Sequence, residues 1–141
     1  MKKKRILSTL IVLCMALSLM SSVAFAAESS ESEGRTARYT AIQRISAILT
    51  IDRWGKAGCV ATVILDDGYT ADVTMEVQQD YVNRWLTIKS WSDSGGPIVE
   101  MLETYYVESG YDYQVVVTVD VYDSNGRFVE SDSAVSETLS Y

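Results

Sequence analysis

The residue types that carry out most acid–base and nucleophilic catalysis are sparse in this sequence. None of its 141 residues is histidine, which excludes Ser-His-Asp and Cys-His catalysis and histidine-ligated metal sites. Carboxylates are numerous, and glycoside hydrolysis needs two of them on either side of a cleft. The pairs Asp72 with Glu76 and Glu100 with Glu103 are expected on strand faces that point to solvent. We therefore predict no catalytic residues and no enzymatic activity.

Two acidic turns carry the oxygen ligands that calcium prefers. They are Asp66-Asp67-Gly68 and Asp123-Ser124-Asn125-Gly126, and neither has the spacing of a complete calcium loop. Asp-Gly and Asn-Gly are also the pairs that supply the positive φ angles of tight turns. We interpret both segments as turns and predict no metal and no cofactor.

Cys59 is the one cysteine that follows the apolar N-terminal segment, so no internal disulfide is expected. It lies in the alternating run 57–63, which favours a small buried apolar side chain. The alternative is a reactive thiol or an intermolecular disulfide. Without a histidine to act as its base, thiol catalysis has little support.

Aromatic side chains are the most suggestive group for ligand binding. Trp85 and Trp91 are six residues apart on one predicted strand, where regular alternation places them on the same face, about 20 Å apart. They could stack on sugar rings, or at least one of them could be the core tryptophan of the fold. Trp54 lies in a predicted turn and is expected to be the most exposed. These three residues are the candidate ligand-binding residues.

The N-terminus has the pattern of a secretory signal peptide, residues 1–26. A basic start, Lys2 to Arg5, precedes the apolar segment Ile6 to Met20 and the small-residue site Ala24-Phe25-Ala26. The short apolar segment disfavours an uncleaved membrane anchor. Cleavage would leave 8 basic and 19 acidic residues, a net charge of −11, which repels nucleic acid and anionic lipid. We predict a secreted, extracellular protein, and loose association with a cell wall stays open.

The rest of the chain divides into a leader and one domain. Residues 27–41 are polar and acidic and are predicted to form a flexible leader, and residues 42–141 form a single β domain. A helix over Ile42–Ile51 is the alternative to a strand there, because its isoleucines also fit helical spacing. The predicted loop Ser92–Pro97 contains the one proline. The seven predicted strands are Ile42–Ile51, Lys56–Leu65, Tyr69–Gln79, Arg84–Trp91, Ile98–Val107, Tyr111–Tyr122 and Arg127–Leu139.

Seven short strands without a convincing helix predict an all-β fold, a seven-stranded antiparallel sandwich. The organising strand is Tyr111–Tyr122, which alternates between a buried and a wetter face. Its first half resembles the sixth strand of fibronectin type III and immunoglobulin-like domains. That resemblance implies a tyrosine corner, in which a hydroxyl bonds back to upstream backbone, with Tyr113 the better candidate and Tyr111 the second.

A wider resemblance spans most of the predicted domain. Gly58-Cys59, the segment Trp85–Ser92, the segment Val107–Tyr113 and a closing hairpin occur in that order. The chain is similar in this to small, secreted, largely uncharacterised β-sandwich proteins of Gram-positive, clostridial-type bacteria. The resemblance implies export and a sandwich fold, and it transfers no active-site residues.

The sequence thus predicts a secreted, non-catalytic module for binding or surface interaction. One alternative is binding of a carbohydrate or cell-wall glycan through Trp54, Trp85 or Trp91. The other is a secreted inhibitor or signal that binds a protein through its loops or an edge strand. A glycan site needs two coplanar exposed aromatic rings, whereas a protein site needs an exposed apolar edge or patch. A homodimer through the seventh strand or through Cys59 is also left open.

Overall fold

The computed structural model describes residues 40–141, so the predicted signal peptide and residues 27–39 of the leader lie outside the described residues. The described part is all β and has no helix long and apolar enough to cross a membrane. Its eight strands are β1 (Ile42–Ile51), β2 (Lys56–Leu65), β3 (Thr70–Asp80), β4 (Trp85–Gly95), β5 (Ile98–Tyr106), β6 (Asp112–Tyr122), β7 (Phe128–Val135) and β8 (Leu139–Ser140).

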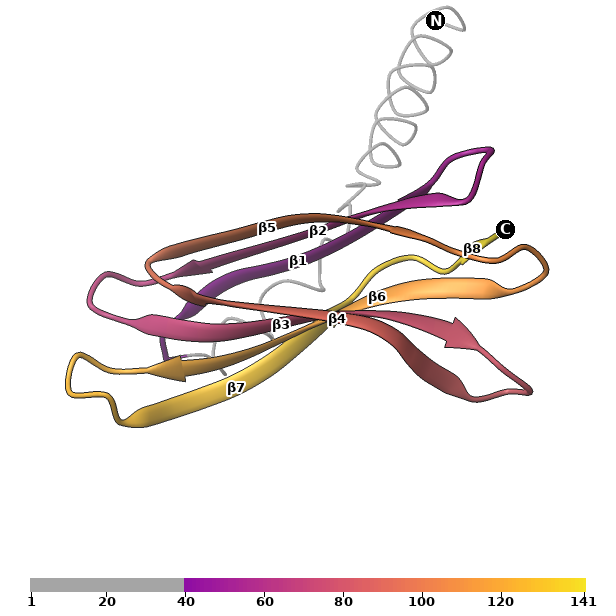
Figure 1. Cartoon of the computed structure of the whole chain (residues 1–141). Helices are drawn as coiled ribbons and strands as arrows, with labels where there is room; N and C mark the ends of the chain where they lie inside the picture. The colour runs from indigo at the N-terminus through magenta and orange to yellow at the C-terminus, as the bar shows by residue number, and fades with distance from the viewer. Residues whose placement is uncertain (1–39) are drawn as a thin grey trace, which may run out of the picture. The chain divides into compact units, whose positions relative to one another are not determined.

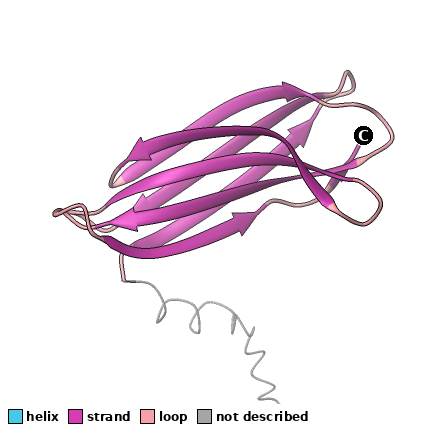
Figure 2. Ribbon diagram, turned by 60° about the horizontal axis from the view of Figure 1, so that its bottom comes forward, coloured by secondary structure: helices cyan, strands magenta, loops and turns pink. Residues whose placement is uncertain are grey.

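The strands form two antiparallel sheets, which confirms the predicted β-sandwich (Figure 1). One sheet has the order β1-β2-β5. The other has the order β4-β3-β6-β7, with β8 paired to β6. Figure 2 shows long strands joined by short turns, without helices. Residues Ile42–Ile51 form a strand, so the helical alternative is wrong.

The core lies between the sheets and is built from alternate residues of each strand. On β6 every second residue from Tyr113 to Val121 is fully buried, as the predicted alternation required. Its neighbour β3 buries Ala71, Val73, Met75 and Val77 beside them on the same inward face. The β2 strand contributes its own alternating set from Ala57 to Leu65.

The predicted seventh strand is two strands in the structure. The β7 strand ends at Val135, and Ser136 then bonds Val115 with both its backbone and its side chain. The Ser136 hydroxyl accepts the Val115 N–H at 2.8 Å, so a side-chain oxygen takes the place of a ladder carbonyl. The chain resumes pairing with β6 only at Leu139.

The predicted loop Ser92–Pro97 is wrong over most of its length. Ser92 and Ser94 pair with Thr74 and Asp72, so β4 continues to Gly95. The hydroxyls of Ser92 and Thr74 are 3.3 Å apart on the solvent side of the sheet. These polar residues mark an exposed edge strand, which composition alone does not distinguish from a loop.

The predicted boundary between leader and domain also shifts. Ala41 is buried in the core cluster, and the backbone N–H groups of Thr40 and Ala41 both donate to the Glu130 carboxylate. The ordered domain therefore includes the last two residues of the predicted leader.

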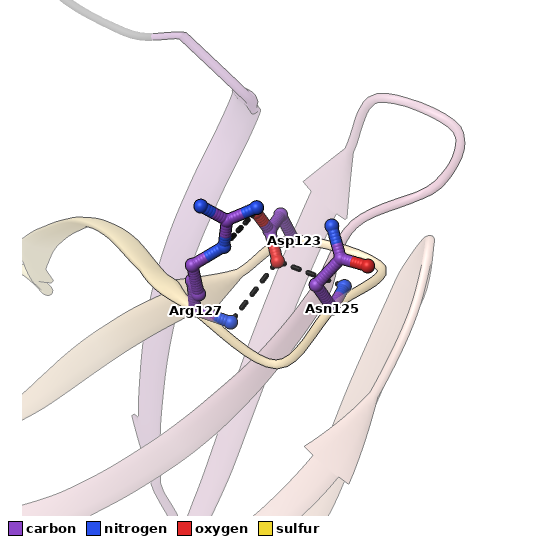
Figure 3. Close-up of polar contacts among 3 residues, drawn as sticks. All are labelled: Asp123, Asn125 and Arg127. Carbon is purple, nitrogen blue, oxygen red and sulfur yellow. Dashed lines mark hydrogen bonds and ion pairs between the residues drawn. The ribbon is translucent and has the colours of Figure 1, made fainter.

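The two acidic turns have the backbone geometry expected of turns. Gly68 and Gly126 have φ angles of 90° and 74°, which glycine adopts without steric cost. In the second turn Asp123 accepts hydrogen bonds from the N–H groups of Asn125 and Arg127, and the Arg127 side chain lies 3.6 Å away (Figure 3). The hydrogen bond from the Arg127 N–H is the main reason that the pKa of Asp123 is lowered.

Candidate functional site

The candidate residues Trp85 and Trp91 lie on opposite faces of the sheet, so their predicted common face is wrong. Trp91 pairs with Met75, which is buried, whereas Trp85 pairs with Asp80 on the outer face. Between them the β4 ladder skips Ile88, which has no partner in β3. A bulge of one residue reverses the alternation of every side chain beyond it.

The three tryptophans therefore have different surroundings. Trp91 is half-buried and packs against the core, with the Lys89 ammonium 5.5 Å from its ring centroid. Trp54 is 66% exposed in the β1–β2 turn, and the Arg53 guanidinium lies 3.9 Å from the centroid of its ring. Trp85 is 41% exposed. Trp54 is the most exposed of the three, as predicted, and the structure brings no two of them together on one face.

The β3–β4 turn next to Trp85 has an unusual backbone. Tyr81 and Arg84 exchange two backbone hydrogen bonds, at 2.8 and 3.2 Å. The two residues between them, Val82 and Asn83, have φ angles of 53° and 60°. A two-residue turn with both φ angles positive normally carries Asn-Gly, because its twist suits a hairpin. Asn83 tolerates this conformation, but a β-branched valine is strained in it.

Large apolar side chains are exposed on both faces of this hairpin end. The Val82 side chain is 76% exposed at the turn. Trp85 lies on the outer face, and Leu86, paired with Gln79, lies on the face that elsewhere covers the core. The exposure of Leu86 shows that the opposite sheet does not cover this end of the hairpin. The β3–β4 hairpin end lies at the lower right of Figure 1. We call Tyr81, Val82, Trp85 and Leu86 the hairpin tip.

A polar hollow of about 320 Å³ adjoins the hairpin tip. Its lining includes Asp80, Tyr111, Asp112 and Ser140. The Ser140 hydroxyl donates to Asp112. One carboxylate oxygen of Asp80, Oδ1, is buried and has no hydrogen-bond partner within the described part of the chain. The hollow offers acceptors for hydroxyl or amino groups beside the exposed Trp85 ring.

Cys59 is free and fully buried, which confirms the structural interpretation of this residue. Burial raises the pKa of its thiol to about 11, and the charge of Glu103 adds to the effect. Glu103 pairs with Cys59 and so shares its inward face, contrary to the predicted solvent orientation. A disulfide to a second chain would require the core to open, because the sulfur is covered on all sides.

Sequence reasoning missed the hairpin tip as a unit. The predicted strands Tyr69–Gln79 and Arg84–Trp91 leave Asp80 to Asn83 as a short connection, and the sequence pairs Trp85 with Trp91 rather than with this turn. A signal was present, since the two-residue turn is Val82-Asn83, with a β-branched valine where Asn-Gly is usual. The comparisons with known proteins add nothing to these residues, because no family model and no curated protein matches the chain.

Proposed function

We propose that the chain is a secreted, non-catalytic binding module that holds a protein partner with its hairpin tip. The proposal treats the fold as fibronectin type III-like. The sheet orders β1-β2-β5 and β4-β3-β6-β7 support that assignment, as does the hydrogen bond from the Tyr113 hydroxyl to the Glu108 carbonyl at 2.6 Å. Fibronectin-like sandwiches present loops and hairpin ends on a rigid scaffold, where recognition residues commonly lie.

The observation that carries the proposal is the coincidence of strain and exposure at Val82. A β-branched residue in the left-handed region costs about 1–3 kcal/mol, and an exposed valine gains nothing from burial in return. Asn or Gly would relieve the strain without changing the turn. Strain retained beside three further exposed apolar side chains is typical of a recognition site.

The partner that fits this tip is a protein with an apolar cleft. Val82 lies at the end of the hairpin and would enter the cleft first. Tyr81 and Trp85 supply aromatic surface, and Leu86 supplies apolar surface on the other face of the same hairpin. Aromatic anchors of this kind carry much of the binding energy when they enter a pocket. Arg84 and Asp80 flank the apolar group and provide a polar rim.

The test compares Trp85→Ala with Trp54→Ala, an exposed tryptophan on a different hairpin. The full chain is expressed in a Gram-positive host, and the protein recovered from the medium is immobilised and exposed to extracellular proteins. We expect saturable capture of a protein that Trp85→Ala weakens at least about tenfold and Trp54→Ala leaves unchanged. Equal loss in both variants, or capture that neither variant changes, contradicts the proposal.

Glycan binding is the second candidate, and the polar hollow beside Trp85 favours it. A pyranose could stack on the Trp85 ring while its hydroxyls donate to Asp80 and Asp112. The experiment adds isolated cell walls and a glycan panel, with tryptophan emission as the readout. Saturable glycan binding lost in both Trp85→Ala and Asp80→Asn would favour this candidate over a protein partner.

A further inference from the structure

The outer face of the β1-β2-β5 sheet is unusually apolar for a surface open to solvent. Leu102 on β5 is 78% exposed, the highest value among the large hydrophobic residues of the described chain. It is aligned with Val60 and Ile48 in one row across the three strands. Ile64 and Ile98 form a second row. The outer face of the other sheet carries mainly Thr, Ser, Gln and Asp on the β3 and β4 strands.

The free edge of β5 differs from the other three sheet edges. In each of those, the ladder skips one residue of the edge strand: Gln43 in β1, Ile88 in β4 and Val129 in β7. Such bulges interrupt the edge and discourage pairing with another chain. The β5 strand pairs with β2 over nine residues without a register shift, and within residues 40–141 no strand covers its other side.

Charge also separates the two sheets. The strands β1, β2 and β5 carry two basic residues, Arg44 and Lys56, and two acidic ones, Glu100 and Glu103. The strands of the other sheet carry eight acidic residues and one lysine. Two copies of this chain therefore meet least repulsion at the β1-β2-β5 sheet.

We propose that a second copy of this chain pairs with the free edge of β5, antiparallel and centred on Leu102, so that two three-stranded sheets become one of six strands. In this register Leu102 lies opposite Leu102 of the second copy, and Ile98 lies opposite Tyr106. The outer row Ile48-Val60-Leu102 continues into the same row of the second copy. Cross-strand apolar pairs of this kind stabilise a sheet.

In this register no two charged side chains of like sign lie directly opposite each other. Glu100 lies opposite Thr104 of the second copy, and Glu103 lies opposite Met101. Centring the pair on Glu100 or on Glu103 would place two carboxylates directly opposite each other, which is destabilising. Centring it on Met101 would leave Tyr105 and Tyr106 without partners. Only the Leu102 register pairs all nine residues of β5.

This inference goes beyond the proposed function, because it needs no foreign partner and uses a different surface. It also replaces the two dimer routes left open by the sequence. The Cys59 sulfur is buried, and the β7 edge carries a bulge and the carboxylates of Glu130 and Asp132. A dimer would present two hairpin tips and so strengthen binding to a partner that holds two sites.

The test measures self-association by sedimentation equilibrium, with the protein recovered from the medium of a host that expresses the full chain. We expect a monomer–dimer equilibrium that reducing agent leaves unchanged. Leu102→Lys and Leu102→Glu should each weaken dimerisation at least about tenfold, because like charges would then face each other. A mixture of these two variants should restore the dimer, because the facing charges are then opposite.

Val135→Lys is the matched control, since Val135 is 55% exposed on the edge strand of the other sheet. It should dimerise like the unsubstituted protein. A monomeric unsubstituted protein would overturn the proposal, whether the β5 edge is empty or covered by residues 27–39. Loss of the dimer in Val135→Lys but not in Leu102→Lys would also overturn it. Trp85→Ala should not affect dimerisation, so failure of this inference and of the proposed function can be told apart.

Discussion

Glu130 and Ala41 are joined by a hydrogen bond of 2.7 Å from the Ala41 backbone N–H to the carboxylate oxygen Oε1. The same oxygen accepts the Ile42 N–H at 3.0 Å, and both oxygens accept from Thr40. One side chain of β7 therefore holds the start of β1, which belongs to the opposite sheet. It satisfies the backbone donors of Thr40 and Ala41, which precede the β1–β2 ladder, and of Ile42, the first residue of that ladder.

Replacing this carboxylate should loosen the N-terminal edge of the domain. Glu130→Gln keeps an acceptor but removes the charge, so we expect a loss of about 1–2 kcal/mol in the free energy of unfolding. Hydrogen exchange of the Thr40, Ala41 and Ile42 amides should become faster, while β6 amides change only with global stability. Glu137→Gln, at an exposed position after the end of β7, is the control. Unchanged exchange at Ala41 in Glu130→Gln contradicts this role.

The Tyr113 hydroxyl should contribute measurably to stability. Its hydrogen bond to the Glu108 carbonyl spans the turn before β6, and Tyr113 is fully buried. Tyr113→Phe should cost about 1–1.5 kcal/mol in denaturant unfolding. Tyr111→Phe, at the other tyrosine considered for this role, should change stability by less than about 0.5 kcal/mol. A larger loss in Tyr111→Phe would reverse the assignment.

Stability should fall at alkaline pH, partly through Cys59. The pKa of its thiol is about 11 in the folded protein against an ordinary value of 9.0. Above pH 9 the unfolded chain loses the proton first, so unfolding becomes easier between pH 9 and 11. At pH 10 the ionisation of Cys59 in the unfolded chain should lower the free energy of unfolding by about 1.4 kcal/mol. Below pH 9 the thiol is protonated in both states, so this loss of stability is absent.

Cys59→Ala isolates this effect. The free energies of unfolding of the variant and of the unsubstituted protein should differ by a constant amount below pH 9. This difference should shrink as the pH rises above 9. Burial also raises the pKa of Tyr113, so part of the alkaline loss should persist in the variant. A difference in the free energy of unfolding that stays constant up to pH 11 would show that the thiol does not ionise on unfolding.

Val82→Asn should move stability and binding in opposite directions. Asparagine accepts the left-handed conformation, so the variant should gain about 0.5–1 kcal/mol in the free energy of unfolding. It also removes an apolar contact from the hairpin tip and should weaken partner capture. Ser90→Asn, an exposed position on β4 away from the turn, is a control for adding an amide. A stability loss in Val82→Asn would mean that the valine packs favourably.

Part of the candidate site could be predicted from local sequence. Trp54 was expected to be exposed because a turn places it outside any ladder, and it is. Trp85 was selected by its residue type and by its even spacing from Trp91, and the common face that this spacing predicts is wrong. Trp85 pairs with Asp80 and lies on the face opposite to Trp91. Both properties follow from the one residue that the β4 ladder skips, Ile88. Nothing in an alternating sequence indicates which residue a ladder skips, because a bulge is set by the partner strand.

The sequence by itself determined the strands and the inward face of most of them, because burial of one face requires apolar residues at a period of two. It also determined the glycine turns, whereas the tyrosine that bonds back from β6 was narrowed to Tyr113 or Tyr111 only by a resemblance to fibronectin-like domains, and the structure shows that it is Tyr113. Only the tertiary structure decided which strands lie at sheet edges, where β4 changes face, and which apolar residues stay uncovered. These properties depend on pairing between distant strands, and a residue such as Leu102 is apolar in sequence whether or not another strand covers it.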